Sequence, residues 1–135
     1  MSRRVLILDL KDDPDLIARY QAYHRPGAVP QAVVRSIREA GIEEMEIYRS
    51  GNRLVMVMDT TEDFDPGAKA AADAVNPDVI AWEELMDRFQ QPLSWAPAGT
   101  KWLEADRIFA ASERPAPSRV PAIFRATFLR KTPHA

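Results

Sequence analysis

The stretch that decides the fold is residues 43–59, which read EEMEIYRSGNRLVMVMD. Apolar and polar side chains alternate over residues 43–50, a pattern typical of a strand with one buried face. The turn sequence Ser-Gly-Asn at residues 50–52 has the composition of a tight hairpin. Residues 53–59 are apolar on both faces, which indicates a strand in the middle of a sheet. The centre of the chain is therefore predicted to be an antiparallel hairpin.

Further strands and helices are predicted on both sides of this hairpin. Residues 3–10 and 101–110 alternate as strands do. Helices are predicted where Pro14, Pro30, Pro66 and Pro77 open a segment, since proline is favoured in the first turn of a helix. Apolar side chains then recur at helical spacing in the first, second and fourth segments, and the third is rich in alanine. These helices cover residues 14–24, 30–40, 65–74 and 77–89.

The order of these elements predicts the fold class. Strand, helices, strand, strand, helices, strand is the order of an α+β, ferredoxin-like domain, with a four-stranded antiparallel sheet and its helices on one face. The other face of the sheet is then left open, and an open apolar face on a small domain usually finds a partner. We therefore expect a homodimer of the dimeric α/β barrel type.

Composition excludes several classes of protein. The chain has 135 residues, a net charge of -2 and 46% hydrophobic residues, which fits one globular domain. Its basic residues are scattered, so we expect no nucleic-acid partner. No apolar run approaches the roughly 20 residues that span a bilayer, so we expect no membrane segment. The lack of cysteine excludes disulfides and thiolate chemistry, and it suits a cytoplasmic location.

The composition changes near residue 112. Residues 112–135 contain four of the eleven prolines and five basic residues against one acidic residue. Such a shift marks a domain edge. We expect residues 1–111 to form the folded domain and residues 112–135 to be an extension. Its apolar side chains either dock on a surface or partner, or the segment is a solvated terminus.

His24 is the first candidate for chemistry. The other histidine, His134, lies next to the C-terminus, so His24 is the only internal side chain with an ordinary pKa near neutrality. Tyr20 lies four residues earlier and therefore shares one helical face with it. Together they suit hydrogen bonding to a small polyhydroxylated ligand. The alternative is that His24 only satisfies carbonyl groups at the end of a helix.

Trp82, followed by Glu83, is the second candidate. An indole ring packs well against the C–H face of a sugar, but helical spacing also allows Trp82 to be ordinary core. The sequence leaves open whether Trp95, in a proline-bounded loop, is a lid or a dimer contact. It also leaves open whether Trp102 lines the same cavity or lies in the interior. No phosphate-binding glycine loop, metal-ligand spacing or nucleophile elbow is present in the sequence.

Seven segments in the same order resemble the L-rhamnose mutarotase family, and within it the L-fucose mutarotase-like branch. They are LKDDP (10–14), YxxxHRPG (20–27), GIEEMEIY (41–48), RLVMVM (53–58), AWEELM (81–86), FQQPL (89–93) and KW (101–102). The resemblance runs from about residue 3 to residue 109. It implies a dimeric ferredoxin-like fold and a cofactor-free enzyme that interconverts the α and β pyranose anomers of a deoxy-sugar.

The resemblance also implies roles for individual residues. His24 matches the family's proton-donating histidine, Tyr20 its substrate-contacting tyrosine, and Trp82 the first of two sugar-stacking tryptophans. The second tryptophan is Glu83 in this chain, which we expect to be a hydrogen-bonding group or a base. A substrate tyrosine of the rhamnose enzymes falls at Met45, and VPQ at residues 29–31 lacks a usual tryptophan. These departures favour L-fucose over L-rhamnose.

A rival hypothesis comes from the same architecture. Non-catalytic ligand-binding modules and cofactor-free monooxygenases also use it, with flat hydrophobic ligands. In that case methionines and tryptophans would line an apolar pocket, and Tyr20 and His24 would anchor one polar end. A pocket rich in hydrogen-bonding groups favours the sugar instead.

Overall fold

The structure is a computed structural model that describes residues 1–112, so the expected extension lies outside the described residues apart from Ser112. Within this range the chain forms four helices and five strands. In chain order they are β1 (Ser2–Leu10), α1 (Pro14–Tyr23), α2 (Gln31–Glu39), β2 (Ile42–Ser50), β3 (Arg53–Thr60), α3 (Pro66–Asp73), α4 (Pro77–Asp87), β4 (Gln90–Gln91) and β5 (Leu103–Glu104).

All strands of the sheet pair antiparallel, in the order β2-β3-β1-β4, and β5 also pairs with β1. The predicted hairpin is confirmed: Ser50 lies opposite Arg53. Gly51 has a φ of 59°, which a glycine adopts at little cost in a two-residue turn. β3 is flanked by β1 and β2, so it is the central strand that its apolar faces predicted.

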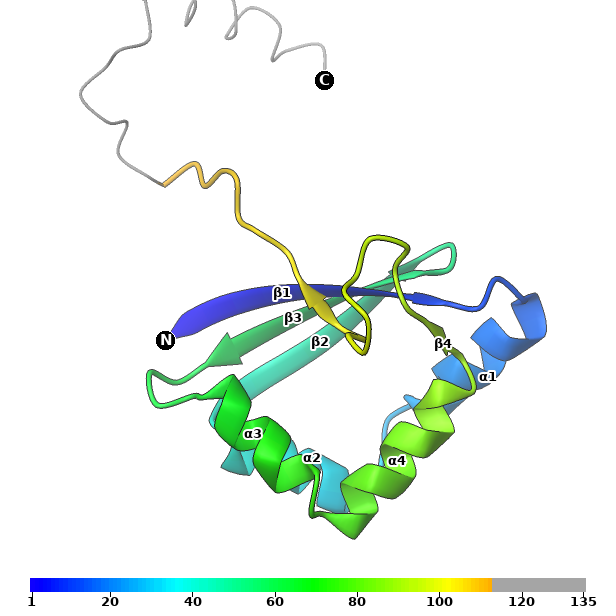
Figure 1. Cartoon of the computed structure of the whole chain (residues 1–135), viewed down its shortest axis with the longest axis horizontal. Coiled ribbons are helices and arrows are strands. Elements are labelled where there is room, and N and C mark those ends of the chain that lie inside the picture. Colours follow the sequence, from blue (N-terminus) through cyan, green and yellow to red (C-terminus); the bar gives the residue numbers. More distant parts are fainter. Residues whose placement is uncertain (113–135) are drawn as a thin grey trace, which may run out of the picture.

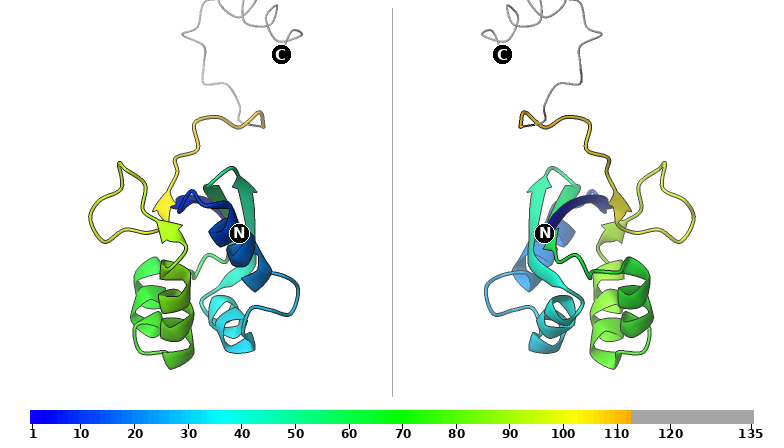
Figure 2. Two further views of the ribbon diagram at one scale, coloured as in Figure 1. Left: turned by 90° about the vertical axis from the view of Figure 1, so that its right-hand side faces the viewer. Right: turned by 90° about the vertical axis from the view of Figure 1, so that its left-hand side faces the viewer.

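The four helices lie on one side of the sheet (Figure 1), and the side views separate the pair α1 and α2 from the pair α3 and α4 (Figure 2). Alternation along β1 and β3 turns Leu8, Leu54 and Met56 toward the helices, where they are buried. The open face carries Val5 and Val57, which pair with each other and are half-buried.

Three of the four helices begin in the same way. Asp13, Asp65 and Asn76 each precede a proline, and each accepts hydrogen bonds from two backbone N–H groups of the first turn. Such an N-cap stabilises a helix by about 1 kcal/mol relative to alanine. These caps fix where α1, α3 and α4 start, as the sequence predicted.

The core lies between the sheet and the helices. One buried cluster joins α1 and α4 to the sheet, and the other joins α2 to the β2–β3 hairpin. The first contains Leu10, Tyr20, Leu54, Met86 and Phe89, and the second contains Ile42, Met56 and Met58.

The prediction of a long last strand over residues 101–110 is wrong. Only β5 pairs with β1, at Leu6 and Ile7, while β4 takes the next positions of the same edge, Asp9 and Leu10. Two short strands therefore share the edge that one long strand was expected to fill. Residues 106–112 pair with no strand among the described residues, and Ile108 is 96% exposed.

None of the helices within residues 1–112 combines the length and apolar character needed to cross a bilayer.

Candidate active site

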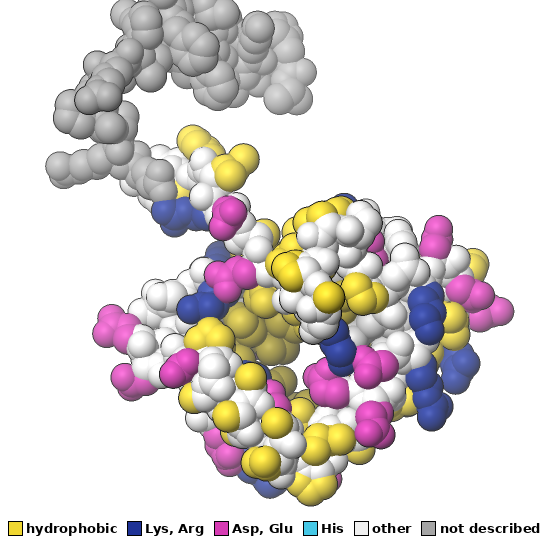
Figure 3. All heavy atoms as spheres, viewed as in Figure 1, with side chains coloured by type: hydrophobic (Ala, Val, Ile, Leu, Met, Phe, Trp, Pro, Cys, Tyr) yellow, Lys and Arg dark blue, Asp and Glu magenta, His cyan; other side chains and the backbone are white. Residues whose placement is uncertain are grey.

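A cavity of about 620 Å³ lies between the buried face of the sheet and the helices. This is a size typical of small-molecule sites. Figure 3 shows a hollow with hydrophobic side chains at its floor and charged side chains around its opening. Tyr20, His24, Trp82 and Glu83 all line it, so the fold brings the four predicted site residues to one place.

His24 follows the last residue of α1 and is half-buried. Its Nδ1 lies 2.7 Å from the backbone carbonyl oxygen of Tyr20. A carbonyl oxygen only accepts, so Nδ1 carries the hydrogen and Nε2 of the neutral ring has a free lone pair. Nε2 has no hydrogen-bond partner among residues 1–112. The two alternatives for His24 are therefore compatible, since the ring satisfies a helix carbonyl and also lines the cavity.

Burial lowers the pKa of His24 below its ordinary value, and the bond to the Tyr20 carbonyl opposes this only in part. The imidazole is therefore mainly neutral at neutral pH. A neutral imidazole with a free Nε2 can take a proton from a hydroxyl group.

Tyr20 is 3% exposed, and its ring centroid lies 4.4 Å from that of His24. Its hydroxyl oxygen accepts a hydrogen bond of 3.4 Å from Nε2 of Gln90. Burial raises the pKa of Tyr20, and the bond from Gln90 lowers it by less. The phenol therefore keeps its hydrogen at neutral pH and can donate it to a ligand.

Trp82 lies on the other side of His24, with ring centroids 5.4 Å apart and an edge-to-face angle of 67°. It also packs against the core cluster that contains Tyr20. Trp82 therefore packs against the core and also lines the cavity. Its role as a stacking surface for a sugar stays a prediction.

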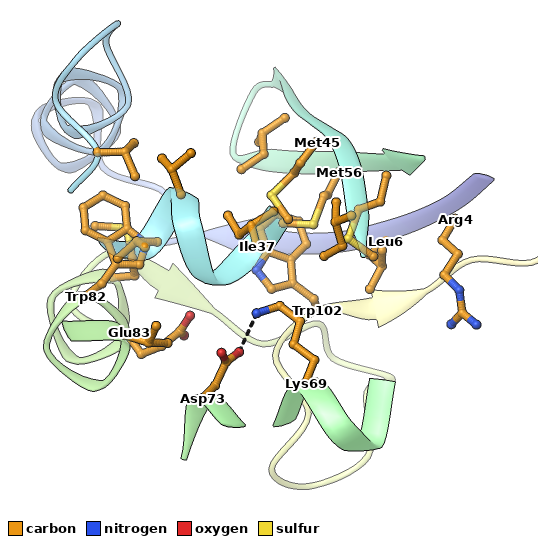
Figure 4. A pocket seen from close by; sticks show the side chains of 18 of the residues that line it. Arg4, Leu6, Ile37, Met45, Met56, Lys69, Asp73, Trp82, Glu83 and Trp102 are labelled. Carbon is orange, nitrogen blue, oxygen red and sulfur yellow. Dashed lines mark hydrogen bonds and ion pairs between the residues drawn. The ribbon is translucent and has the colours of Figure 1, made fainter. Parts of the chain in front are cut away.

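Glu83 is next to Trp82 at the cavity wall (Figure 4). Its carboxylate forms an ion pair of 2.9 Å with Nζ of Lys101, which also lies 2.5 Å from a carboxylate oxygen of Asp87. Burial lowers the pKa of Lys101, but the bonds to Asp87 and Glu83 outweigh it and the pKa is raised. Lys101 thus stays charged and ties the loop before β5 to α4. This arrangement suits Glu83 as a hydrogen-bond acceptor more than as a base.

The rest of the cavity is mixed in character. Met45 and Met56 form part of an apolar wall on the sheet, next to Trp102 (Figure 4). On the opposite side α3 contributes Lys69 and Asp73, which form an ion pair of 2.7 Å. Trp102 is therefore a wall of the cavity. Trp95 does not line it: it is 58% exposed, and the guanidinium of Arg53 lies over its ring.

Sequence reasoning missed Gln90 and Lys69 as cavity residues. Gln90 follows a helix as part of a two-residue strand too short to be visible as a pattern, and Lys69 lies in an alanine-rich helix without apolar periodicity. Within residues 1–112 no three His, Asp or Glu side chains come together as metal ligands would.

Comparisons with known proteins extend this picture. The family model for L-rhamnose mutarotase matches residues 3–111. An L-fucose mutarotase of Xanthomonas campestris is 56% identical over 113 residues, which are 84% of this chain and 90% of that protein. A UPF0734 protein of Dictyostelium discoideum is 32% identical over 76% of this chain and 83% of that protein.

Two solved structures have a similar fold. An L-rhamnose mutarotase from Formosa agariphila superposes with a TM-score of 0.57 at 15% identity, covering 82% of this chain and 98% of that one. Tetracenomycin F2 cyclase from Streptomyces glaucescens gives a TM-score of 0.55 at 13% identity, covering 84% and 100%. At such low identity these likenesses concern the fold alone, and they confirm the predicted fold class.

The resemblance seen in the sequence motifs is confirmed by the family model and by the Xanthomonas relative. The matched region ends at residue 111, beside the last described residues. The chain belongs to the L-rhamnose mutarotase family.

Proposed function

We propose that this protein is a sugar mutarotase that interconverts the α and β pyranose anomers of a deoxyhexose, with L-fucose preferred to L-rhamnose. The observation that carries the proposal is the state of His24: its Nδ1 hydrogen is held by the Tyr20 carbonyl, and its Nε2 is left unbonded at the cavity. The choice of sugar rests on the Xanthomonas relative, which is named an L-fucose mutarotase.

Mutarotation needs one proton to move from the anomeric hydroxyl to the ring oxygen. His24 Nε2 takes the proton of the anomeric hydroxyl while the bond between C1 and the ring oxygen breaks, with its electron pair going to the ring oxygen. The imidazolium then gives the same proton to that oxygen, which leaves an open-chain aldehyde. Rotation about C1–C2 and the reverse steps close the ring on the other face. A positioned acid–base group contributes typically about 10²- to 10⁴-fold in rate.

Tyr20 and Trp82 assist this reaction in different ways. Since the phenol of Tyr20 stays protonated, it donates a hydrogen bond to the ring oxygen as negative charge develops there. Trp82 offers an indole face to the apolar side of the sugar. Glu83, held by Lys101, accepts a hydrogen bond from a sugar hydroxyl.

We also propose that the protein is a homodimer that pairs through the open face of the sheet. Val5, Ile7, Val55 and Val57 lie on this face, and none of the described helices covers it. A paired sheet face would remove these side chains from water, which favours association by about 25 cal/mol per Å² of apolar surface.

The rival function keeps one supporting observation, the apolar sheet wall that includes Met45 and Met56. A flat hydrophobic ligand would suit that wall. Such a ligand offers few hydrogen-bonding groups to the unbonded Nε2 of His24 and to the protonated phenol of Tyr20.

A panel of freshly dissolved single anomers tests the proposal. L-fucose, L-rhamnose and D-galactose are followed by NMR from one pure anomer to equilibrium, with and without the protein. We expect the fastest acceleration with L-fucose. No acceleration of any of these sugars, together with binding of a hydrophobic aromatic ligand, would favour the rival.

A further inference from the structure

Gln90 is a buried polar residue at the same cavity to which neither the sequence motifs nor the proposed mechanism gives a role. It lies in β4 opposite Leu10, directly after the buried ring of Phe89. Gln90 is 8% exposed and lines the cavity together with Tyr20, His24 and Trp82.

The amide of Gln90 acts on the phenol of Tyr20. Its Nε2 donates a hydrogen bond to the hydroxyl oxygen of Tyr20, and this is a contact between two buried side chains 70 residues apart. A hydroxyl group that accepts from one side turns its own hydrogen elsewhere. Within residues 1–112 this hydrogen meets no acceptor. A ligand in the cavity can supply one, because Tyr20 lines that cavity.

The other end of the amide indicates that packing is not the reason for a glutamine at this place. Gln90 Oε1 is buried and has no hydrogen-bond partner among the described residues. A buried acceptor without a donor costs stability, whereas an apolar side chain of similar length would not carry that cost. Polar groups that break a packing rule in this way are expected at functional sites.

We infer that Gln90 is a positioning residue: its amide holds the Tyr20 hydroxyl so that the phenol hydrogen points to the sugar and not along the protein. Gln90 itself does not touch the reacting atoms. The inference rests on the proposed function, because it gives Tyr20 the role of a donor to the sugar ring.

The main variant is Gln90→Met, which keeps the length of the side chain and removes the donor. The hydroxyl hydrogen of Tyr20 can then point in other directions. We therefore expect kcat/KM for anomer exchange to fall about tenfold, which corresponds to the usual net contribution of one hydrogen bond. Because the unpaired Oε1 disappears as well, we expect an unchanged or higher Tm. Gln91→Met, on the exposed neighbour, is the matched control and should leave both quantities unchanged.

A double-mutant cycle with Tyr20→Phe separates positioning from direct contact. Without the phenol hydroxyl there is nothing to orient, so adding Gln90→Met to Tyr20→Phe should change kcat/KM by less than about twofold, within the additivity error of such cycles. The inference is overturned if Gln90→Met exchanges anomers as fast as wild type. It is also overturned if Gln90→Met lowers the Tm as well as the activity. A third contradicting result would be an equal fold-decrease in kcat/KM from Gln90→Met in wild type and in Tyr20→Phe.

His24→Asn, measured alongside, tells the two proposals apart. If His24→Asn slows exchange and Gln90→Met does not, only the role of Gln90 fails. If the wild-type protein does not accelerate exchange at all, the proposed function fails and the role of Gln90 falls with it.

Discussion

The Nδ1 atom of His24 lies 2.7 Å from the carbonyl oxygen of Tyr20, one helical turn earlier, at the C-terminal end of α1. A single residue spacing thus does two things. It satisfies a carbonyl group that the helix end leaves free, and it fixes the tautomer of the imidazole so that Nε2 is the atom left for chemistry. The same spacing brings the centroids of the two rings to 4.4 Å, with the ring planes tilted by 34°.

The pH dependence of exchange follows from the burial of His24. Burial lowers its pKa below 6.5, and in the proposed mechanism the neutral ring is the form that accepts the sugar's proton. We expect kcat/KM to be constant near neutrality and to fall on the acid side with a midpoint below 6.5. A pH–rate profile from pH 4.5 to 8 measures this; an acid limb with its midpoint above 6.5 would contradict it.

The stability of the fold should depend on the same group. The unfolded chain binds a proton on His24 near pH 6.5, whereas the folded chain binds it only at lower pH. The contribution of His24 to the free energy of unfolding is therefore fully present above about pH 6.5, and it is lost as the pH falls through the pKa of His24 in the folded chain. Urea unfolding gives the free energy of unfolding of wild type and of His24→Asn at pH 5 and at pH 7.5. We expect this free energy to change less between the two pH values in the variant than in wild type. An equal change in both proteins would contradict this prediction.

Trp82→Ala should weaken sugar binding more than it slows the chemical step. In the proposed function its indole face packs against the sugar, and its ring lies edge-to-face with that of His24, with centroids 5.4 Å apart. A loss of about 1–2 kcal/mol of aromatic contact predicts a KM about tenfold higher with a smaller change in kcat. Trp95→Ala removes an exposed tryptophan that does not line the cavity, and it should leave KM unchanged. An equal rise of KM in both variants would show that the effect is not specific to the cavity.

Lys101→Ala should destabilise the protein in a salt-dependent way. Lys101 lies between the carboxylates of Glu83 and Asp87, which are one turn apart on α4 and repel each other once the lysine is removed. All three groups are partly exposed, so we expect a loss of at most about 1 kcal/mol at low salt. Thermal unfolding in 20 mM and 500 mM NaCl should give a smaller difference between variant and wild type at the higher salt, because screening weakens the ion pairs. A difference that does not depend on salt would exclude this electrostatic role.

Much of the fold could be predicted because local signals agree with the tertiary structure. The Asx–proline pairs at residues 13, 65 and 76 give the starts of three helices, and Gly51 marks the hairpin. The strand predicted at residues 101–110 failed because alternation describes the strand alone. It does not reveal that β4 occupies half of the edge of β1 on which that strand would pair.

The candidate site was predicted in part for a similar reason. Tyr20 and His24 lie on one helix, so their spacing placed them together before any tertiary structure was known. Gln90 reaches Tyr20 across 70 residues, and Lys101 reaches Glu83 across 18. Neither contact has a periodic signature in the sequence, since each depends on how β4 and the loop before β5 return to the helices.

The most direct test of the central claim is the rate of anomer exchange of L-fucose, measured by saturation-transfer NMR in wild type and in His24→Asn at pH 7.5. If the unbonded Nε2 of His24 carries the proton, the variant should be slower by about 10²- to 10⁴-fold with an unfolding transition as cooperative as that of wild type. Exchange at the wild-type rate in a folded His24→Asn protein would contradict the account.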